Sequence, residues 1–259
     1  MRIFIMTDLE GAAMVTRFNQ TRNPTPEAKA IAMRFLTDEI NACIDGIREV
    51  DADAEIIVWD GHGSGGVDIT RLHPECKFIA RGPIDPPYYI DKSVDALFFV
   101  GQHAMAGTPQ GNLAHTYSSL SIEYFKLNGK PIGELGCRAA MAGELDVPSV
   151  FVSGDDKTIA EAKALIPDIV GAVTKKGLGL ELALSLSSDK SCKLIREKAT
   201  DAVMKIGTIP PCRIKGPYEL EIKVTPGHDP SGYLKGQEGI RLDELTVLLK
   251  SDSLIKLPI

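Results

Sequence analysis

The sequence predicts an α/β fold: a largely parallel-sheet domain over residues 1–175, followed by a smaller α+β C-terminal domain over residues 176–259. The length of 259 residues suits one large domain or two modest ones. In the first part, short apolar segments alternate with longer amphipathic ones, which is typical of right-handed βαβ units. Later, Tyr218–Val224 alternates between apolar and charged side chains, as expected of a sheet with one face in water.

Five short, apolar segments bounded by turn-forming residues are predicted to be strands of the parallel sheet. They are Arg2–Thr7, Glu55–Trp59, Lys77–Ala80, Asp95–Val100 and Ser149–Val152. Tyr117–Leu127 is also predicted to be extended, and the pair Asn128-Gly129 after it is typical of a hairpin turn.

Four segments are predicted to be helices. The first begins at Thr25-Pro26-Glu27, because threonine is a common N-cap, proline fits the first turn and glutamate complements the positive end of the helix dipole. Apolar residues then recur at roughly helical spacing from Ile31 to Val50. The other three helices are expected at Leu135–Leu145, Lys157–Ile166 and Asp189–Ile206.

The composition excludes several classes of protein. Hydrophobic residues make up 44% and charged residues 25%, which excludes a collagen-like or disordered chain. The net charge of -6 argues against broad binding to nucleic acid or to a membrane surface. The five cysteines form no CxxC motif and no disulfide framework. Because no apolar run is long enough for a signal peptide or a membrane span, we expect a soluble, cytoplasmic protein.

Side chains that can bind metal or move protons follow three of the predicted strands. They are Asp8 and Glu10 after the first strand, Asp60 and His62 after the second, and His103 after Asp95–Val100. Because the carboxyl ends of parallel strands share one edge, where ligands usually bind, we expect these groups to converge. Carboxylate oxygen and imidazole nitrogen together suit zinc, manganese or a related divalent ion. Each residue alone could be an ordinary loop or core residue, so the convergence carries the metal hypothesis.

Two further residues could belong to the same site. His115 follows His103 by twelve positions and could be a catalytic group, and Glu134, between two glycines before a predicted helix, could be another ligand. Taken singly, each would be a loop residue in most proteins. A binuclear phosphoesterase uses a similar mix of ligands and therefore stays an alternative.

The loop Gly61–Gly66 matches the G-x-G-x-x-G pattern of dinucleotide-binding proteins. Its context does not fit, because Pro74 interrupts the segment that would form the helix and no acidic residue follows the next strand to bind a ribose. A non-catalytic nucleotide-binding protein is the other alternative. The glycines could instead let the backbone approach a metal or substrate closely.

Five blocks of sequence keep a characteristic order over roughly the first 170 residues. They are Thr7–Gly11, Asp60–Gly63, Gly101–Pro109, Pro131–Gly136 and Val152–Asp156, with His115 between the third and the fourth. Together they resemble the D-stereospecific zinc aminopeptidases, a family first described as dipeptide-transport-operon D-aminopeptidases. The segment between His103 and His115 is one residue longer than the family pattern, and the C-terminal part matches it less well.

The resemblance implies a binuclear metallo-aminopeptidase that hydrolyses short peptides with D-amino acids at the N-terminus. It implies two zinc ions bridged by Asp8 and further held by four ligands, namely Glu10, His62, His103 and Glu134. His115 takes the place of the family's proposed catalytic histidine. A ring-like homo-oligomer is also implied. The remaining two histidines, His73 and His228, are expected to lie in a loop and a surface turn without a chemical role.

Overall fold

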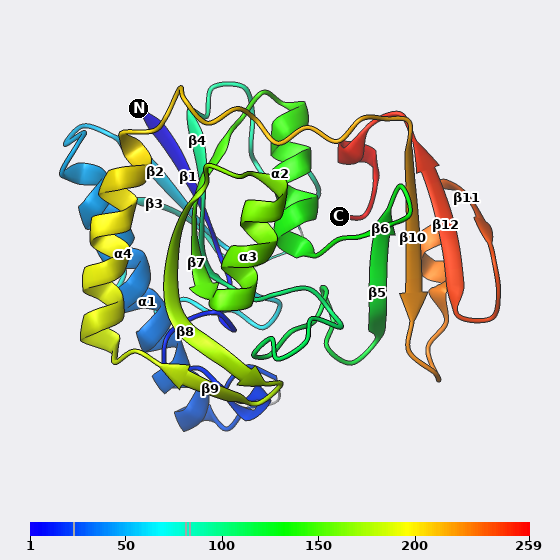
Figure 1. Ribbon diagram of the computed structural model, residues 1–259, viewed down its shortest axis with the longest axis horizontal. Helices are drawn as coiled ribbons and strands as arrows, with labels where there is room; N and C mark the ends of the chain where they lie inside the picture. The colour runs from blue at the N-terminus through cyan, green and yellow to red at the C-terminus, as the bar shows by residue number, and fades with distance from the viewer. Residues whose placement is uncertain (23, 81, 83) are drawn as a thin grey trace.

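A seven-stranded sheet forms the centre of the larger part of the molecule, in the order β3-β2-β1-β4-β7-β8-β9 (Figure 1). Every neighbouring pair is parallel except β8 and β9. The strands are β1 (Arg2–Thr7), β2 (Glu55–Asp60), β3 (Lys77–Ile79), β4 (Ala96–Gln102), β7 (Ser149–Asp155), β8 (Val170–Gly179) and β9 (Leu182–Ser185). The computed structural model describes residues 1–22, 24–80, 82 and 84–259. The predicted α/β class is confirmed.

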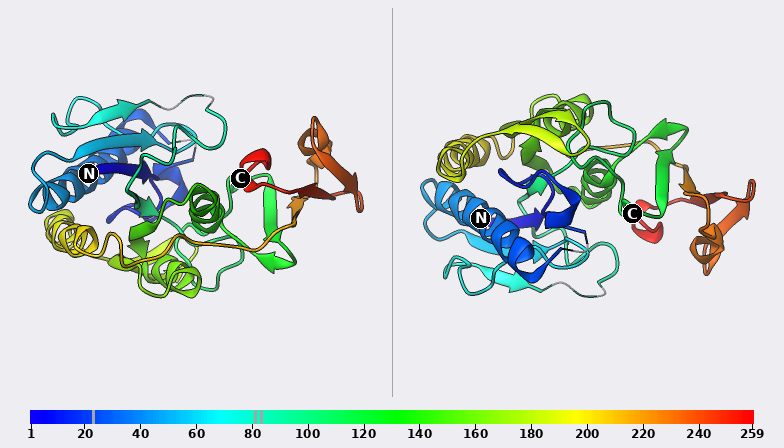
Figure 2. Two further views of the ribbon diagram at one scale, coloured as in Figure 1. Left: turned by 90° about the horizontal axis from the view of Figure 1, so that it is seen from above. Right: turned by 90° about the horizontal axis from the view of Figure 1, so that it is seen from below.

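Four helices cover the two faces of this sheet. They are α1 (Pro26–Arg48), α2 (Glu134–Glu144), α3 (Asp156–Leu165) and α4 (Ser188–Val203). The helices α1 and α4 pack together on one face, and α2 and α3 lie on the other (Figure 2). The N-cap predicted for α1 is present, since Thr25 Oγ1 accepts a hydrogen bond of 3.2 Å from Ala28 N. Ile31 is 49% exposed, because it lies on the outer face of α1 rather than on the face toward the sheet.

A second, antiparallel sheet has five strands in the order β11-β12-β10-β5-β6 and lies beside α2 (Figure 1). Its strands are β5 (Ile122–Leu127), β6 (Lys130–Pro131), β10 (Tyr218–Val224), β11 (Glu238–Arg241) and β12 (Thr246–Ser251). The hairpin turn predicted between β5 and β6 is confirmed, since Asn128 and Gly129 have φ angles of 51° and 77°, as a type I′ turn requires. Short 3₁₀ segments complete the fold at Phe18–Gln20, Pro230–Leu234 and Leu254–Lys256.

Sheet membership does not follow the boundary expected after residue 175. That position lies inside β8, and both β9 and α4 after it pack with the parallel sheet. Conversely, β5 and β6 precede it yet pair into the second sheet, where Leu220 faces Leu127 and Ile222 faces Phe125. Burial of these apolar side chains joins distant segments of the chain. The division of the chain into two domains at this residue therefore stays a prediction.

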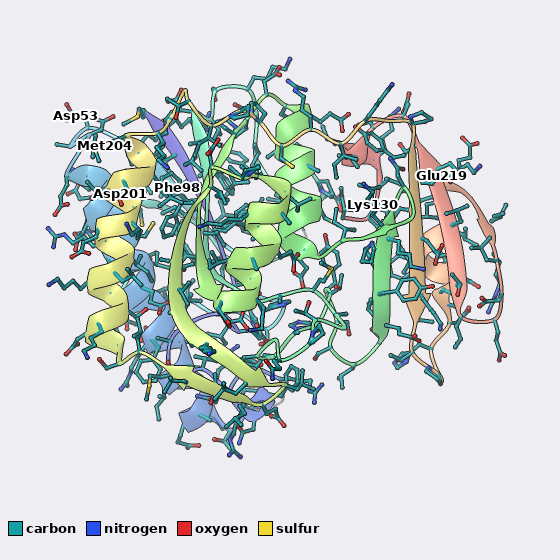
Figure 3. The ribbon with its side chains drawn as sticks, viewed as in Figure 1. Asp53, Phe98, Lys130, Asp201, Met204 and Glu219 are labelled. Carbon is teal, nitrogen blue, oxygen red and sulfur yellow. The ribbon has the colours of Figure 1, made fainter. Side chains whose placement is uncertain are left out.

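The core of the larger sheet is aromatic and aliphatic. Phe98, in the middle of β4, is fully buried and stacks on Phe151 of β7 with ring centroids 5.5 Å apart, whereas Asp201 and Met204 lie at the periphery (Figure 3). Burial on both faces explains why these strands are continuous apolar runs. Within the described part of the chain, no helix combines the length and apolar character needed to cross a membrane.

Candidate metal centre

Five of the six predicted site residues follow strands or begin a helix at one edge of the parallel sheet. Thr7 at the end of β1 is paired with Asp60 of β2 and with Val100 of β4, so the three strands end side by side. Asp8 and Glu10 follow β1, His62 follows β2 and His103 follows β4, while Glu134 is the first residue of α2. His115 comes from the loop between β4 and β5. The predicted convergence at the carboxyl edge is present in the structure.

Three close contacts join these side chains, two made by His103 and one by His62. His103 Nε2 lies 3.1 Å from Asp8 Oδ2 and 3.3 Å from Glu134 Oε1. His62 Nε2 lies 3.3 Å from Glu10 Oε1. Donor atoms of Asp8, Glu10 and His103 all lie within 4.8 Å of one another, as do those of His103, His115 and Glu134. The two groups of donors therefore share His103, and the geometry also brings His115 within ligand distance.

The chemistry of the donors fits a divalent cation. Glu10 Oε2 is buried and accepts no hydrogen bond from any described residue. A buried carboxylate oxygen without a partner carries a desolvation penalty, which a bound cation would remove. Carboxylate oxygen and imidazole nitrogen are both regular zinc ligands. The site therefore holds the donors, the charge and an unsatisfied oxygen that a metal would use.

The backbone sets the tautomers of two histidines. His103 Nδ1 donates to Ala104 O over 3.0 Å, and His115 Nδ1 donates to Leu113 O over 2.8 Å. In the neutral form each ring therefore keeps its lone pair on Nε2. At His62 either tautomer is satisfied, since Ser64 N can donate to Nδ1 over 3.3 Å and Ser64 Oγ can accept from it over 3.2 Å.

Burial and mutual repulsion shape the ionisation of the cluster. Burial, and then the negative charge of Glu10, raise the pKa of Asp8. Burial disfavours the charged form of His103, but the carboxylates of Asp8 and Glu134 outweigh it and raise its pKa well above the usual value. At His115 burial and the neighbouring His103 both lower the pKa, which favours a neutral ring. The cluster as a whole attracts positive charge.

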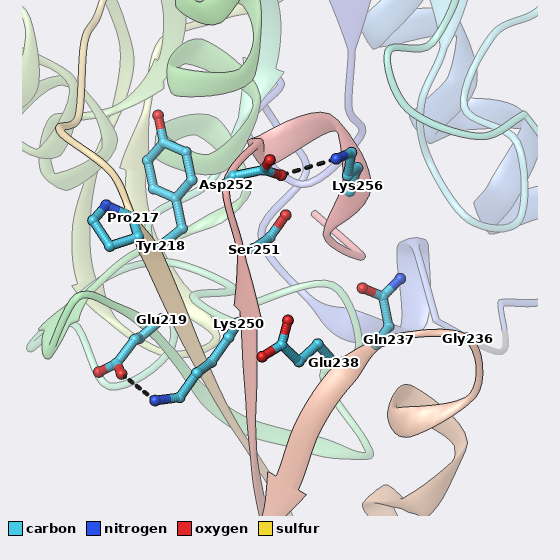
Figure 4. Close-up of a pocket in the computed structure, with 10 residues that line it drawn as sticks. All are labelled: Pro217, Tyr218, Glu219, Gly236, Gln237, Glu238, Lys250, Ser251, Asp252 and Lys256. Carbon is cyan, nitrogen blue, oxygen red and sulfur yellow. Dashed lines mark hydrogen bonds and ion pairs between the residues drawn. The ribbon is translucent and has the colours of Figure 1, made fainter.

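A cavity of about 240 Å³ opens onto this cluster. It is lined by Asp8, Glu10, Thr21, Arg22, His62, Gly63, Ser64, His115, Tyr117, Ser118, Ser119 and Leu120. A larger cavity of about 870 Å³ lies on the second sheet, where the ion pairs Glu219–Lys250 and Asp252–Lys256, each 2.9 Å long, occupy its walls (Figure 4). Four of the five charged residues that line the larger cavity are already paired with each other, so the smaller cavity is the better candidate for chemistry.

The Gly61–Gly66 loop orders His62 rather than opening a nucleotide-binding helix. No helix follows it among the described residues of this segment. The Asp60 carboxylate accepts a hydrogen bond of 2.9 Å from Gly66 N, which closes the loop back onto the end of β2.

His73 lies 3.4 Å from Asp45, and His228 lies in an exposed turn beside Thr225. Both therefore stay outside the cluster, as predicted.

Several supporting residues were not predicted from the sequence. The Arg138 guanidinium lies 4.7 Å from the ring centres of both Trp59 and Tyr88, and its Nη2 lies 3.9 Å from Glu134 Oε2. Tyr117 N donates to Glu134 Oε1 over 2.6 Å. The spacing of four residues between Glu134 and Arg138 on a helix was a usable signal, because such pairs lie on one face.

Strand β8 supports the loop that carries Glu10. Buried Lys175 donates through Nζ to Glu10 O over 2.5 Å and also to Val15 O, and Thr174 Oγ1 donates to Gly11 O over 2.8 Å. No sequence motif marks Lys175 or Thr174, and β8 itself was not predicted from the sequence.

Comparisons with known proteins agree with this geometry. The sequence model of peptidase family M55, described as D-aminopeptidase, matches residues 1–257. A D-aminopeptidase of Bacillus subtilis (strain 168) is 30% identical over 216 residues, which cover 82% of this chain and 77% of the relative. A solved structure, described as the Zn-dependent D-aminopeptidase DppA from Bacillus subtilis, a self-compartmentalizing protease, superposes with a TM-score of 0.89 at 26% identity, covering 99% of this chain and 93% of the other. The chain therefore belongs to the peptidase M55 family of D-aminopeptidases and is a metallo-aminopeptidase.

Proposed function

We propose that this protein is a binuclear zinc aminopeptidase that releases a D-amino acid from the N-terminus of short peptides in the cytoplasm. The observation that carries the proposal is the set of three carboxylates and three imidazoles at one sheet edge, with a buried Glu10 oxygen that lacks a hydrogen-bond partner. The zinc dependence of the structural relative supports the choice of metal.

Five residues would hold the two ions. Asp8 would bridge them, as the family resemblance implies, and its Oδ2 lies 3.1 Å from Nε2 of His103, the residue that belongs to both donor groups. Glu10, His62, His103 and Glu134 would complete the coordination. When bound, zinc polarises a carbonyl group and lowers the pKa of a water molecule toward ~7.

His115 would move the proton that the reaction requires. Its Nδ1 is engaged by Leu113 O, so Nε2 is the atom that can accept and return a proton. Burial keeps the ring neutral near physiological pH, which suits a base. Stacking on His103 fixes the orientation of the ring. These features support His115 as the catalytic base and acid.

The experiment that tests this function compares four substrates with the zinc-loaded protein. We expect hydrolysis of D-Ala p-nitroanilide and D-Ala-D-Ala, much slower hydrolysis of L-Ala p-nitroanilide, and none of p-nitrophenyl phosphate. Equal rates for the two stereoisomers would contradict the D-specificity. Turnover of the phosphate ester alone would replace the peptidase by a phosphoesterase.

Self-assembly into a ring-like homo-oligomer is also proposed. The structural relative is described as self-compartmentalizing. In addition, the β8–β9 hairpin carries an apolar surface, since Leu180, Leu182 and Leu184 are 54%, 59% and 68% exposed. Apolar side chains clustered on a surface are typical of protein–protein contacts. Light scattering after size-exclusion chromatography should give a mass of many chains, and a monomeric mass at micromolar concentration would exclude the ring.

A further inference from the structure

A permanent positive charge lines the cavity beside the candidate metal ligands. Of the residues around the 240 Å³ cavity, Arg22 alone carries such a charge, in a wall that otherwise includes the carboxylates of Asp8 and Glu10. Among the described residues Arg22 has no carboxylate partner. An arginine that faces a polar cavity without an acidic partner is available to a negatively charged ligand.

The structure holds this guanidinium in place without using its full set of donors. Its Nη1 is the engaged nitrogen, at 3.2 Å from Ser119 Oγ and 3.5 Å from Ser119 O. The guanidinium carbon lies 4.2 Å above the centre of the Phe18 ring, so the planar group is stacked. Within the described chain, Nη2 and Nε have no hydrogen-bond acceptor, which leaves three N–H groups for another group.

Ring contacts connect Arg22 to the catalytic candidates. Phe18, under the guanidinium, meets His115 edge-on, with centroids 6.2 Å apart and an interplanar angle of 70°. His115 in turn stacks on His103. Arg22 is therefore separated from His115 by a single phenyl ring, a span that the two or three residues of a short peptide, at ~3.5 Å each, can cover.

We infer that Arg22 binds the C-terminal carboxylate of a short peptide substrate and thereby selects for dipeptides and tripeptides. This inference rests on the proposed peptidase function. A short peptide is a zwitterion, with an ammonium group and a carboxylate at opposite ends. Arg22 on the cavity wall complements the carboxylate, and the amino end of the peptide would lie at the candidate metal site. A longer peptide would place its carboxylate beyond this residue and lose the contact.

The test pairs a peptide acid with its amide, D-Ala-D-Ala and D-Ala-D-Ala amide, in the zinc-loaded protein. The wild-type protein should favour the acid, and Arg22→Gln should raise KM for the acid by ~10- to 100-fold while leaving the amide unaffected. Arg22→Lys should restore part of the preference, because it keeps the charge but not the fork of donors. Arg17→Gln, an exposed arginine of the same segment, should behave as wild type.

The outcomes separate the two proposals. If Arg22→Gln leaves the acid-to-amide ratio unchanged, or weakens both substrates equally, Arg22 does not bind the carboxylate. If the wild-type protein hydrolyses neither peptide, the proposed function fails. In that case, calorimetry measures the dissociation constants of the acid and the amide with wild type and with Arg22→Gln. A preference of the wild-type protein for the acid that the variant loses supports the role of Arg22. Equal binding of acid and amide by the wild-type protein overturns it.

Discussion

The imidazole rings of His103 and His115 lie face to face, with centroids 3.8 Å apart and planes inclined by 13°. The carbonyl of Ala104 ties the two residues together, because it accepts a hydrogen bond from His103 Nδ1 over 3.0 Å and another from His115 N over 3.1 Å. One histidine is thus placed relative to the other by the same backbone group. A proposed metal ligand and a proposed catalytic group are held in a fixed relation.

Replacing His115 by alanine should separate catalysis from metal binding. We expect kcat to fall by ~10²- to 10⁴-fold, because proton transfer by a positioned side chain contributes this much. The zinc content should stay at the wild-type value, since five other residues are proposed to hold the ions. The measurements are steady-state kinetics and elemental analysis of the same preparation.

His228→Ala is the matched control, because this histidine lies in an exposed turn near Thr225. It should change neither kcat nor zinc content. Full activity in the His115 variant would remove it from the mechanism, and loss of zinc would reassign it as a ligand, a position its distance to His103 and Glu134 permits.

Gly101→Ala should disrupt the site through the backbone. Gly101 has a φ of +77°, and a Cβ there would lie 2.0 Å from Asp8 O. The strand ends that carry Asp8 and His103 would have to move apart, so we expect a loss of ~3 kcal/mol or more in the free energy of unfolding. Zinc content should fall with it. Urea denaturation and elemental analysis measure the two effects.

Gly107→Ala provides the comparison for this variant. Its φ of +79° is nearly the same, but no atom lies within 4 Å of the added Cβ. Only the strain of the left-handed conformation applies, at about 1 kcal/mol. Equal destabilisation by the two substitutions would show that the close approach at Gly101 is unimportant.

Glu39 should make the stability depend on pH. Burial raises the pKa of this carboxyl to about 7, although Ala13 N and Ser191 Oγ donate hydrogen bonds to it. In the native state this carboxyl therefore keeps a proton that the unfolded chain releases near pH ~4.3. The contribution of Glu39 to the free energy of unfolding is complete below pH ~4.3 and is lost as the pH rises through 7. Glu39→Gln should gain on the order of 3 kcal/mol relative to wild type between pH 4 and pH 8.

Urea unfolding of both proteins across this pH range provides the measurement. Glu49→Gln is a control of opposite sign, because hydrogen bonding to Arg196 lowers the pKa of Glu49. That variant should be less stable than wild type above pH ~4.3, and this deficit should disappear as the pH falls below ~4.3 through the lowered pKa of Glu49. A difference between Glu39→Gln and wild type that does not vary with pH would show that Glu39 titrates normally.

The strands that position the site were predictable because each is a continuous apolar run. Strand β8 was missed for the opposite reason: Val170–Gly179 contains two lysines and three glycines, and one of these lysines is the fully buried Lys175. Its partners are Glu10 O and Val15 O, far away in sequence, so nothing local marks Lys175 as a core residue. Tertiary contacts override local pattern here.

The candidate ligands could be predicted because topology brings strand ends to one edge and because the family pattern orders them. Arg22 could not, since it lies in a polar loop without periodicity, and its environment comes from Phe18 and Ser119. The wall of the cavity joins segments near residues 21, 63 and 118. Only the folded chain shows which loop side chains share this space.

The most direct test of the metal centre is elemental analysis of the purified protein beside an Asp8→Ala variant. The binuclear arrangement predicts two equivalents of zinc per chain in the wild-type protein and almost none in Asp8→Ala, since the proposed bridge holds both ions. Asp60→Asn is the control: Asp60 is also buried at this edge, and the amide oxygen of the asparagine can still accept the hydrogen bond from Gly66 N that closes the His62 loop, so the zinc content of this variant should stay near two equivalents. Unchanged zinc in Asp8→Ala would contradict the account.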